Sequence, residues 1–456
     1  MRRVVFLGPP AGDATWDHLV RARAREMTVA LEGLHLEVLQ LTTDDLIHRH
    51  DETHAVIARF DPDLITAPNF NYLLLASLLS TDLFEQPTPV LALWDDPLGA
   101  LVNYAERKAW FWEREALESP PIVPASGFSS AVSMFARALR LQSDAALCAP
   151  AQFKALADRP NVVHFGWDSG HIQAMRQLQL VRADRVHWAP VATYQPFLDM
   201  GAKSPSLPAV RDVAFCGNLY LHSFERQLAH LAEPLLQVVN QVCAAKEQSL
   251  DRSVWDLLLS SLAQLPAAVC RAHQLLPNQR AFWDLYKLVA WNGLNARVRL
   301  AILSSIRRRV NVFGLFADPE SAGLLHRHPN LDYQGHADHF TELPAIYATT
   351  RINVCVTNGL IYQGTPSKLF DCVASGGFAL CDPKADLVRI FGPIVEEIFF
   401  RNADELNDKI EYFLSRPRKR QEITEAMRER IVADGTVTSL FQTAISAVSH
   451  CLGSAA

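Results

Sequence analysis

The 456-residue sequence lacks the features that mark several large classes of protein. It has no uninterrupted apolar run as long as a membrane-spanning helix requires, since even the run at 71–84 is broken by Asp82. The apolar stretch near the start, Val4 to Leu7, is too short for a secretion signal. The sequence also shows no repeat at the periods of solenoid proteins. We therefore expect neither a membrane-spanning protein nor a secreted precursor nor a repeat protein.

An excess of positive charge is also missing. The formal net charge is −6, and no basic stripe stands out, so no nucleic-acid partner is expected. The dense basic runs lie at 307–309 and 416–420. We interpret both as solvated helix ends, with a phosphate or peripheral membrane contact as the open alternative.

The eight cysteines form no CxxC pair and no framework of a small disulfide-rich domain. Several, such as Cys216 and Cys355, lie in apolar, strand-like runs, which predicts buried free thiols in a reducing compartment. We therefore expect a cytoplasmic protein. The histidine clusters lack carboxylate or cysteine partners at zinc-site spacing, so we expect surface histidines and no metal site.

Short apolar runs alternate with helical patterns through the first half of the chain. Strands at this spacing, separated by helices, are typical of βαβ units and a parallel sheet. The predicted strands are 4–7, 34–41, 62–66, 89–94, 144–148 and 185–188.

A polar, proline-rich stretch follows at 194–212 and predicts an interdomain linker. The predicted strands of the second half are 213–218, 310–314, 331–333, 352–356 and 378–380. The stretch at about 224–308 is helical throughout and longer than one crossover needs, so part of it is an insertion. We predict a domain at 1–200, a linker at 201–211, a second domain at 212–430, and a C-terminal helix at 431–456 that is a candidate for crossing back to the first domain.

The segment 362–383 is the most informative part of the chain. Thr365 can cap a helix that begins near Pro366, and Lys368 and Asp371 lie three apart on one face of that helix. Free backbone amides and a cation at one helix start suit phosphate, and a carboxylate suits a ribose hydroxyl. The segment therefore predicts a site for a nucleotide sugar, with an ordinary capped αβ connection as the alternative.

With Lys368, Phe370, Asp371 and the run 375–377, this segment resembles the donor-binding motif of GT-B glycosyltransferases. It is most similar to the group that resembles the spore-maturation protein CgeB, although Asp371 stands where that group usually has glutamate. Further stretches resemble the same pattern in the same order, at 213–220, 310–314, 331–338, 341–356 and 403–423, and more weakly at 92–97 and 185–197.

The resemblance implies an α/β protein of the GT-B fold, with two Rossmann-like parallel-sheet domains facing across a cleft and a helical insertion in the second half. It implies transfer of a sugar from a nucleotide-activated donor to an acceptor hydroxyl, without a metal or other cofactor. The implied acceptor is a bacterial surface glycan or protein. A non-catalytic sugar-nucleotide-binding protein and a sugar-nucleotide epimerase are the alternatives.

Candidate residues follow from the chemistry that such a transfer needs. A base must accept the acceptor proton, and Asp95 and Asp96 follow a strand end where a carboxylate would point into the cleft; a turn cap before Pro97 is the alternative. His164, Asp168 and Asp13 are weaker candidates. Arg226 is a phosphate ligand or, equally, a solvated helix charge. The residues expected to hold the donor are Gly217, Asn218, Arg226, Gly314, Thr365, Ser367, Lys368 and Asp371.

Overall fold

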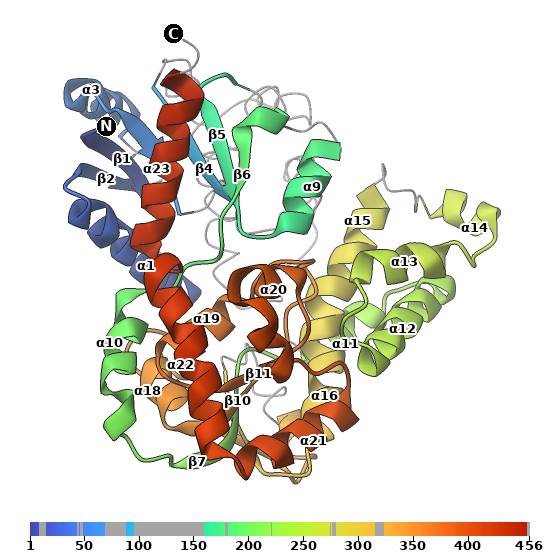
Figure 1. Cartoon of the computed structure of the whole chain (residues 1–456). Helices are drawn as coiled ribbons and strands as arrows, with labels where there is room; N and C mark the ends of the chain where they lie inside the picture. The colour runs from blue at the N-terminus through green and yellow to red at the C-terminus, as the bar shows by residue number, and fades with distance from the viewer. Residues whose placement is uncertain are drawn as a thin grey trace. The chain divides into compact units, whose positions relative to one another are not determined.

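The computed structural model describes residues 1–8, 15–42, 45, 49–68, 88–94, 159–177, 181–219, 221–273, 275, 280–314 and 323–453. The chain divides into two compact units (Figure 1). The first unit is Met1–Pro190 together with Thr436–Ala456, and the second unit is Val191–Gly435.

The first unit is built on a parallel sheet with the strand order β2-β1-β3-β4-β5-β6. Strands β1 and β5 are buried along almost their whole length, as expected for a parallel sheet covered on both faces. The strands are β1 (Arg3–Gly8), β2 (Glu37–Thr42), β3 (Leu64–Thr66), β4 (Val90–Trp94), β5 (Val162–Gly166) and β6 (Val186–Trp188).

Helices accompany this sheet, and the last helix of the chain is one of them. Helix α23 (Val437–Gly453) packs against α1 (Thr15–Gly33) and against β5, so the C-terminal segment belongs to the first unit (Figure 1). The remaining helices described here are α3 (His50–Phe60), α9 (Ser169–Gln177) and the short 3-10 helix η2 (Ala183–Arg185).

The predicted strands of the first half are confirmed at β1, β2, β3, β4 and β6. Strand β5 was missed because its sequence, with His164 in the centre and a glycine at the end, interrupts the apolar pattern. The strand predicted at 144–148 lies outside the described residues.

The second unit has its own parallel sheet, in the order β11-β10-β7-β8-β9, and it confirms the predicted strands of the second half. The side chains of Phe215, Phe370 and Phe413 are buried in its core. The strands are β7 (Arg211–Cys216), β8 (Val310–Phe313), β9 (Leu331–Gly335), β10 (Thr350–Cys355) and β11 (Ala379–Cys381). The helices that follow or flank them are α10 (Gln195–Lys203), η3 (Ser204–Ser206), α18 (Leu343–Ala348), α19 (Ser367–Ala374), α20 (Ala385–Phe391), η5 (Gly392–Ile398), α21 (Ala403–Leu414) and α22 (Pro417–Asp434).

An all-helical segment connects β7 to β8, in the part of the chain where the insertion was predicted. Its sixth helix, η4, has π-helical hydrogen bonding and leads directly into α16. The segment comprises α11 (Leu221–Leu228), α12 (Glu233–Gln248), α13 (Val254–Leu262), α14 (Ala267–Ala272), α15 (Arg280–Lys287), η4 (Leu288–Val298) and α16 (Arg299–Ser304).

Residues 201–211, which were predicted to be a linker, lie within the second unit. Helix α10 and the 3-10 helix η3 cover the beginning of this stretch, and α10 packs on α18 and α19. Gly201 permits this packing because a side chain there would collide with the carbonyl group of Ala374. A proline-rich, polar composition therefore does not distinguish a linker from a segment that is docked on its own domain.

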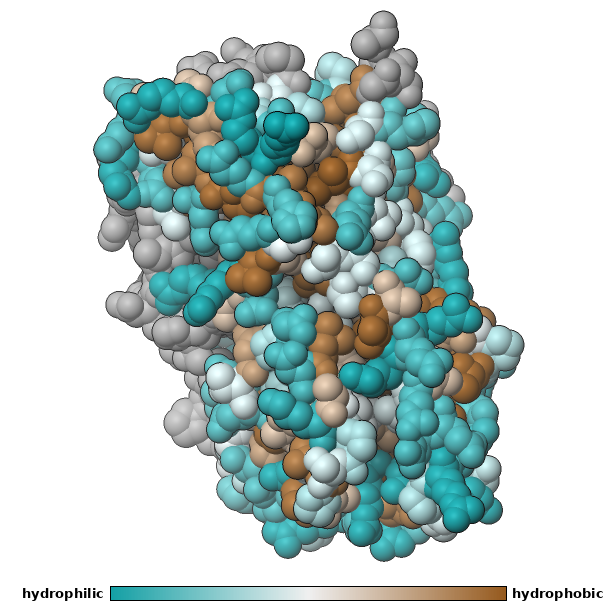
Figure 2. Space-filling view, turned by 60° about the vertical axis from the view of Figure 1, so that its left-hand side comes forward, coloured by the Kyte–Doolittle hydropathy of each residue, from teal (hydrophilic) through white to brown (hydrophobic). Residues whose placement is uncertain are grey.

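None of the helices formed by the described residues is long and apolar enough to cross a membrane. On the face that Figure 2 shows, hydrophilic side chains are interspersed with separate hydrophobic patches.

Candidate functional site

Two glycines follow neighbouring strands of the second unit at their carboxyl ends. The amide of Gly217, after β7, donates a hydrogen bond to the carbonyl of Phe313 at 2.7 Å. The amide of Gly314, after β8, donates to the carbonyl of Gly335 at 3.0 Å. A Cβ atom on Gly314 would collide with the carbonyl of Gly217, so the close approach of these two turns requires glycine. The structure thus brings together two of the residues predicted to hold the donor.

Lys368 reaches the same place from the first turn of α19. Its ammonium nitrogen lies 4.5 Å from the centroid of the Phe215 ring, in a cation–π contact. A Cβ atom on Gly217 would lie 2.5 Å from this nitrogen, so the lysine also packs against the Gly217 backbone. Among the described residues, the Lys368 ammonium has no hydrogen-bond acceptor and no carboxylate partner. An unpaired cation beside two glycine turns suits an anionic ligand.

Arg299, at the start of α16, is a residue of this site that the sequence analysis missed. Its guanidinium donates to the carbonyl of Val356 at 3.0 Å and to that of Asn218 at 3.1 Å. It also lies 5.8 Å from the centroid of the Phe215 ring, so Lys368 and Arg299 contact the same ring. No local motif could have indicated this role, because it depends on how the helical insertion folds back onto the sheet.

Burial and, to a smaller extent, the positive charge of Arg299 lower the pKa of Lys368 from 10.5 to about 8. An anion bound between Lys368 and Arg299 would offset the repulsion between their positive charges. The five residues Gly217, Asn218, Arg299, Gly314 and Lys368 are called the lysine cluster below.

The start of α19 differs from the prediction in how it is capped. The residue before the helix is Pro366, and no side chain caps the helix. Thr365 was expected to be the cap, but its hydroxyl is buried and has no hydrogen-bond partner among the described residues. The prediction of a Thr365 cap was therefore wrong, because Pro366, and not Thr365, is the residue directly before the helix. Ser367 begins the helix, where backbone amides lack partners within the helix.

Asp371 lies on the same helix but contacts different groups from Lys368. Its side chain is 1% exposed, and it accepts a hydrogen bond of 2.8 Å from the hydroxyl of Thr193. The ring of His339 lies 3.7 Å from its other carboxylate oxygen. These contacts tie α19 to the start of the second unit and to the segment after β9. A ribose contact for Asp371 stays a prediction.

Arg226 lies in the last turn of α11 and makes no hydrogen bond or ion pair among the described residues. Asp95, Asp96 and Asp13 lie outside the described residues.

Of the weaker candidates for the base, His164 is fully buried within β5, and Asp168 is 1% exposed. Asp168 accepts hydrogen bonds from the amides of Gly170, at 2.9 Å, and His171, at 3.2 Å. It therefore caps α9, and the ring of His171 lies 3.7 Å from its second oxygen.

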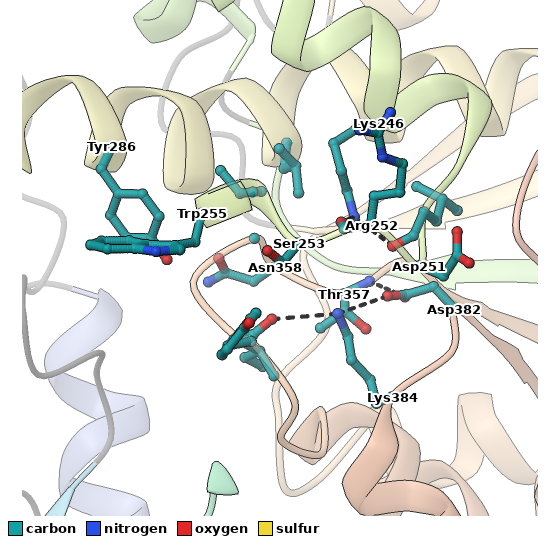
Figure 3. A pocket seen from close by; sticks show the side chains of 16 residues that line it. Lys246, Asp251, Arg252, Ser253, Trp255, Tyr286, Thr357, Asn358, Asp382 and Lys384 are labelled. Carbon is teal, nitrogen blue, oxygen red and sulfur yellow. Dashed lines mark hydrogen bonds and ion pairs between the residues drawn. The ribbon is translucent and has the colours of Figure 1, made fainter. Parts of the chain in front are cut away.

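A pocket at the carboxyl ends of β10 and β11 contains two buried lysines, Lys246 and Lys384 (Figure 3). The Lys246 ammonium donates to the carbonyls of Leu250 at 2.5 Å and Arg252 at 2.7 Å, and burial lowers its pKa to about 7. Nearby, Lys384 pairs with Asp382 at 3.2 Å. Unlike Lys368, both lysines have oxygen partners, so this pocket holds the α12–α13 turn and the loop after β11 in place.

Transfer without a metal stays a prediction. Within the ranges that the structure describes, no group of three or more His, Cys, Asp or Glu side chains converges as a metal site would require.

Residues 297–446 match a protein-family model described as glycosyl transferase-like. Sucrose-phosphate synthase from Thermosynechococcus elongatus has a similar structure, with a TM-score of 0.50, 13% identity, and all of both chains covered. A glycosyltransferase from Rickettsia africae ESF-5 aligns with a TM-score of 0.49, 9% identity, and 99% and 98% of the two chains covered. Anabaena Alr3699/HepE in complex with UDP aligns with a TM-score of 0.46, 12% identity, and 99% and 100% covered. No match was found among curated protein sequences.

The likeness to sucrose-phosphate synthase confirms the predicted fold class, two α/β units with all-parallel sheets. The family match covers Arg299, Gly314, Lys368 and Asp371, and confirms the predicted enzyme class for this part of the chain. Over residues 297–446 the chain is thus similar to glycosyl transferase-like proteins.

Proposed function

We propose that the chain transfers a sugar from a nucleotide-activated donor to an acceptor hydroxyl, and that the lysine cluster holds the donor diphosphate. The observation that carries the proposal is the ammonium of Lys368, which has no acceptor or carboxylate partner among the described residues and lies beside the Gly217 turn, on the first turn of α19. A half-buried cation that has no partner among the described residues is costly unless a ligand supplies the opposite charge. The family match, which covers Arg299, Gly314 and Lys368, supports a glycosyl donor as that ligand.

The cluster meets the main electrostatic need of the reaction, which is to stabilise the leaving diphosphate. Lys368 and Arg299 supply positive charge, and the free amides at the start of α19 supply hydrogen bonds. With two cations in place, we propose that transfer needs no metal ion or other cofactor. The diphosphate would also raise the pKa of Lys368 and hold it in the charged form.

The remaining roles follow the resemblance to the CgeB-like group. Asp371 would bind the ribose, and Asp95 or Asp96 would accept the proton of the acceptor hydroxyl. The proposed acceptor is a bacterial surface glycan or protein. A cytoplasmic location is supported by the cysteines, because all seven in the described residues are free thiols.

The test begins with a panel of UDP-, GDP-, TDP- and ADP-sugars, screened for stabilisation of the full chain against heat. The best donor is then incubated with a panel of alkyl glycosides, with and without a chelator, and release of nucleoside diphosphate is measured. We expect release that depends on the acceptor and continues in the chelator. Binding without release would indicate a binding protein, and conversion of the donor to another nucleotide sugar would indicate an epimerase. If no donor stabilises the chain, the proposal is wrong.

A further inference from the structure

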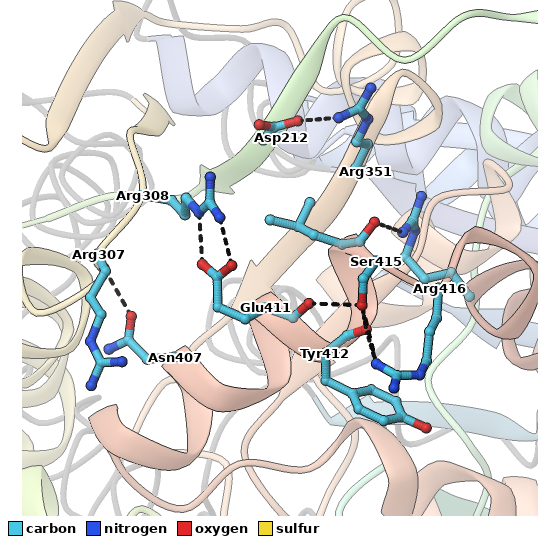
Figure 4. A network of polar contacts seen from close by, with 11 residues as sticks. Asp212, Arg307, Arg308, Arg351, Asn407, Glu411, Tyr412, Ser415 and Arg416 are labelled. Atoms are coloured by element: carbon cyan, nitrogen blue, oxygen red, sulfur yellow. Dashed lines mark hydrogen bonds and ion pairs between the residues drawn. The ribbon is translucent and has the colours of Figure 1, made fainter.

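Two basic runs that are far apart in the sequence meet on one surface of the second unit. Arg308, just before β8, donates to both carboxylate oxygens of Glu411 in α21, at 2.7 and 2.6 Å (Figure 4). The amide of Arg307 donates to the side chain of Asn407 in the same helix at 2.9 Å. Because Arg416 follows α21 directly, the run at 307–309 and the run at 416–420 become neighbours.

This surface continues into a groove at the amino ends of β7 and β8. Arg351, on β10, pairs with Asp212 at 2.7 Å, and Arg309 pairs with Asp332 at 2.8 Å. We call the whole surface the arginine surface. It comprises Val210, Arg211, Asp212, Arg307, Arg308, Arg309, Asp332, Arg351, Glu411, Tyr412, Arg416 and Arg420.

The arginine surface carries an excess of positive charge although the chain as a whole is acidic. Arg308, Arg309 and Arg351 are neutralised by carboxylates. The surface has four more arginines, and none of them pairs with a carboxylate among the described residues. The side chains of three donate hydrogen bonds to neutral oxygens, and the side chain of Arg307 makes no hydrogen bond to a described residue. The four are Arg211, Arg307, Arg416 and Arg420.

Apolar side chains are exposed among these cations. Val210 is 63% exposed and Tyr412 is 44% exposed, although the Tyr412 ring also has an edge contact with the ring of Phe413. The guanidinium of Arg416 lies 3.9 Å from the centroid of the Tyr412 ring. Cations beside an exposed aromatic ring and an exposed aliphatic side chain match the headgroups and the interface of an anionic bilayer. A polyanion in solution would need the charges alone.

We infer that the arginine surface docks on an anionic phospholipid membrane. The surface lies at the amino ends of β7, β8 and β10, whereas the lysine cluster lies at the carboxyl ends of the same sheet. A unit docked in this way keeps the lysine cluster away from the lipid. The inference does not depend on which donor the chain uses.

The experiment is cosedimentation of the full chain with vesicles of phosphatidylcholine and phosphatidylglycerol, compared with vesicles of phosphatidylcholine alone. The wild type should bind the anionic vesicles and should be released by high salt. The double variant Arg307→Gln/Arg416→Gln breaks no ion pair and should weaken binding by roughly 30-fold. The control variant Arg59→Gln/Arg430→Gln removes the same charge at exposed positions elsewhere and should bind as the wild type does.

A second variant distinguishes binding to a membrane from binding to other polyanions. Tyr412→Ser/Val210→Ser leaves every charge in place and should still weaken binding to anionic vesicles. Equal loss in the control variant would show that net charge alone drives binding, and would overturn the inference. So would tight binding of the wild type to heparin without binding to vesicles. Nucleotide sugars should stabilise Arg307→Gln/Arg416→Gln and Tyr412→Ser/Val210→Ser against heat as they do the wild type. A failure of membrane binding can therefore be told apart from a failure of donor binding.

Discussion

The ammonium of Lys368 lies over the ring of Phe215, 4.5 Å from its centroid, although the two residues come from segments that are far apart in the sequence. Phe215 is in β7 and Lys368 is in α19, so the contact forms only when the sheet of the second unit is assembled. The contact fixes a charged group beside the Gly217 turn without neutralising it.

Replacing this lysine should separate binding from stability. In Lys368→Met the donor loses a charged partner, so the dissociation constant of the best nucleotide sugar should rise roughly 10- to 100-fold by calorimetry. The free energy of unfolding should not fall, because the variant no longer holds a half-buried cation that has no partner among the described residues. Lys203→Met, which removes an exposed lysine at the end of α10, is the control. Unchanged donor affinity in Lys368→Met would remove Lys368 from the site.

Donor binding should weaken as the pH rises through about 8. The pKa of Lys368 is lowered to about 8, so the free chain loses this positive charge above that pH. Binding then requires uptake of a proton, and the dissociation constant should increase about tenfold per pH unit well above pH 8. Lys368→Met should show no such increase. An equally steep pH dependence in that variant would assign it to another group.

The two glycine turns should respond differently to a methyl group. In Gly217→Ala the new Cβ meets the flexible end of Lys368 and, at 3.1 Å, the ring of Phe215, so donor affinity should fall and the loss of stability should be smaller than in Gly314→Ala. In Gly314→Ala the new Cβ meets the backbone of Gly217, which should lower the free energy of unfolding by about 1–3 kcal/mol. Gly323→Ala, where a Cβ meets nothing within 4 Å, is the control. Urea denaturation and calorimetry would measure both effects, and equal behaviour of the two variants would contradict the geometry.

Asp371 and Thr193 should be energetically coupled. Thr193→Val and Asp371→Asn each disturb the same buried hydrogen bond, so each should cost about 1–3 kcal/mol, and the double variant should cost less than their sum. If Asp371 also binds ribose, Asp371→Asn should lower the affinity for the donor, whereas Thr193→Val should lower it less. Additive stability effects would mean that the hydrogen bond contributes nothing.

Lys246 should make the chain more stable at alkaline pH. Its pKa falls from 10.5 to about 7 on folding, so between these values the unfolded chain holds a proton that the folded chain releases. The free energy of unfolding should therefore rise with pH across this range, and the gain should be lost as the pH falls toward 7. Lys246→Met should show a smaller rise in urea denaturation. Parallel curves for the two proteins would place the pKa of Lys246 near its usual value.

The predicted strands came from local patterns, and the grouping of Gly217, Gly314 and Lys368 came from the resemblance to GT-B glycosyltransferases. All three residues follow strands of one parallel sheet, and the carboxyl ends of such strands meet at the same edge. The sequence indicates which residues lie at this edge of the sheet, because the apolar runs of two strands end at Gly217 and Gly314.

The features that sequence analysis missed depend on tertiary contacts. Arg299 joins the site only because η4 and α16 return the insertion to the sheet, and helical periodicity does not specify that path. Asp371 was placed on the correct helix, but its partner Thr193 lies 178 positions away. The basic runs were interpreted as separate solvated ends, and the contacts of Arg307 and Arg308 with helix α21 bring them together.

A crystal structure with the best donor of the panel bound would test the central claim most directly. We predict that the diphosphate lies within hydrogen-bond distance of the Lys368 ammonium and of the amides at the start of α19. A diphosphate bound elsewhere, with Lys368 still resting against Phe215 and free of the donor, would contradict the account.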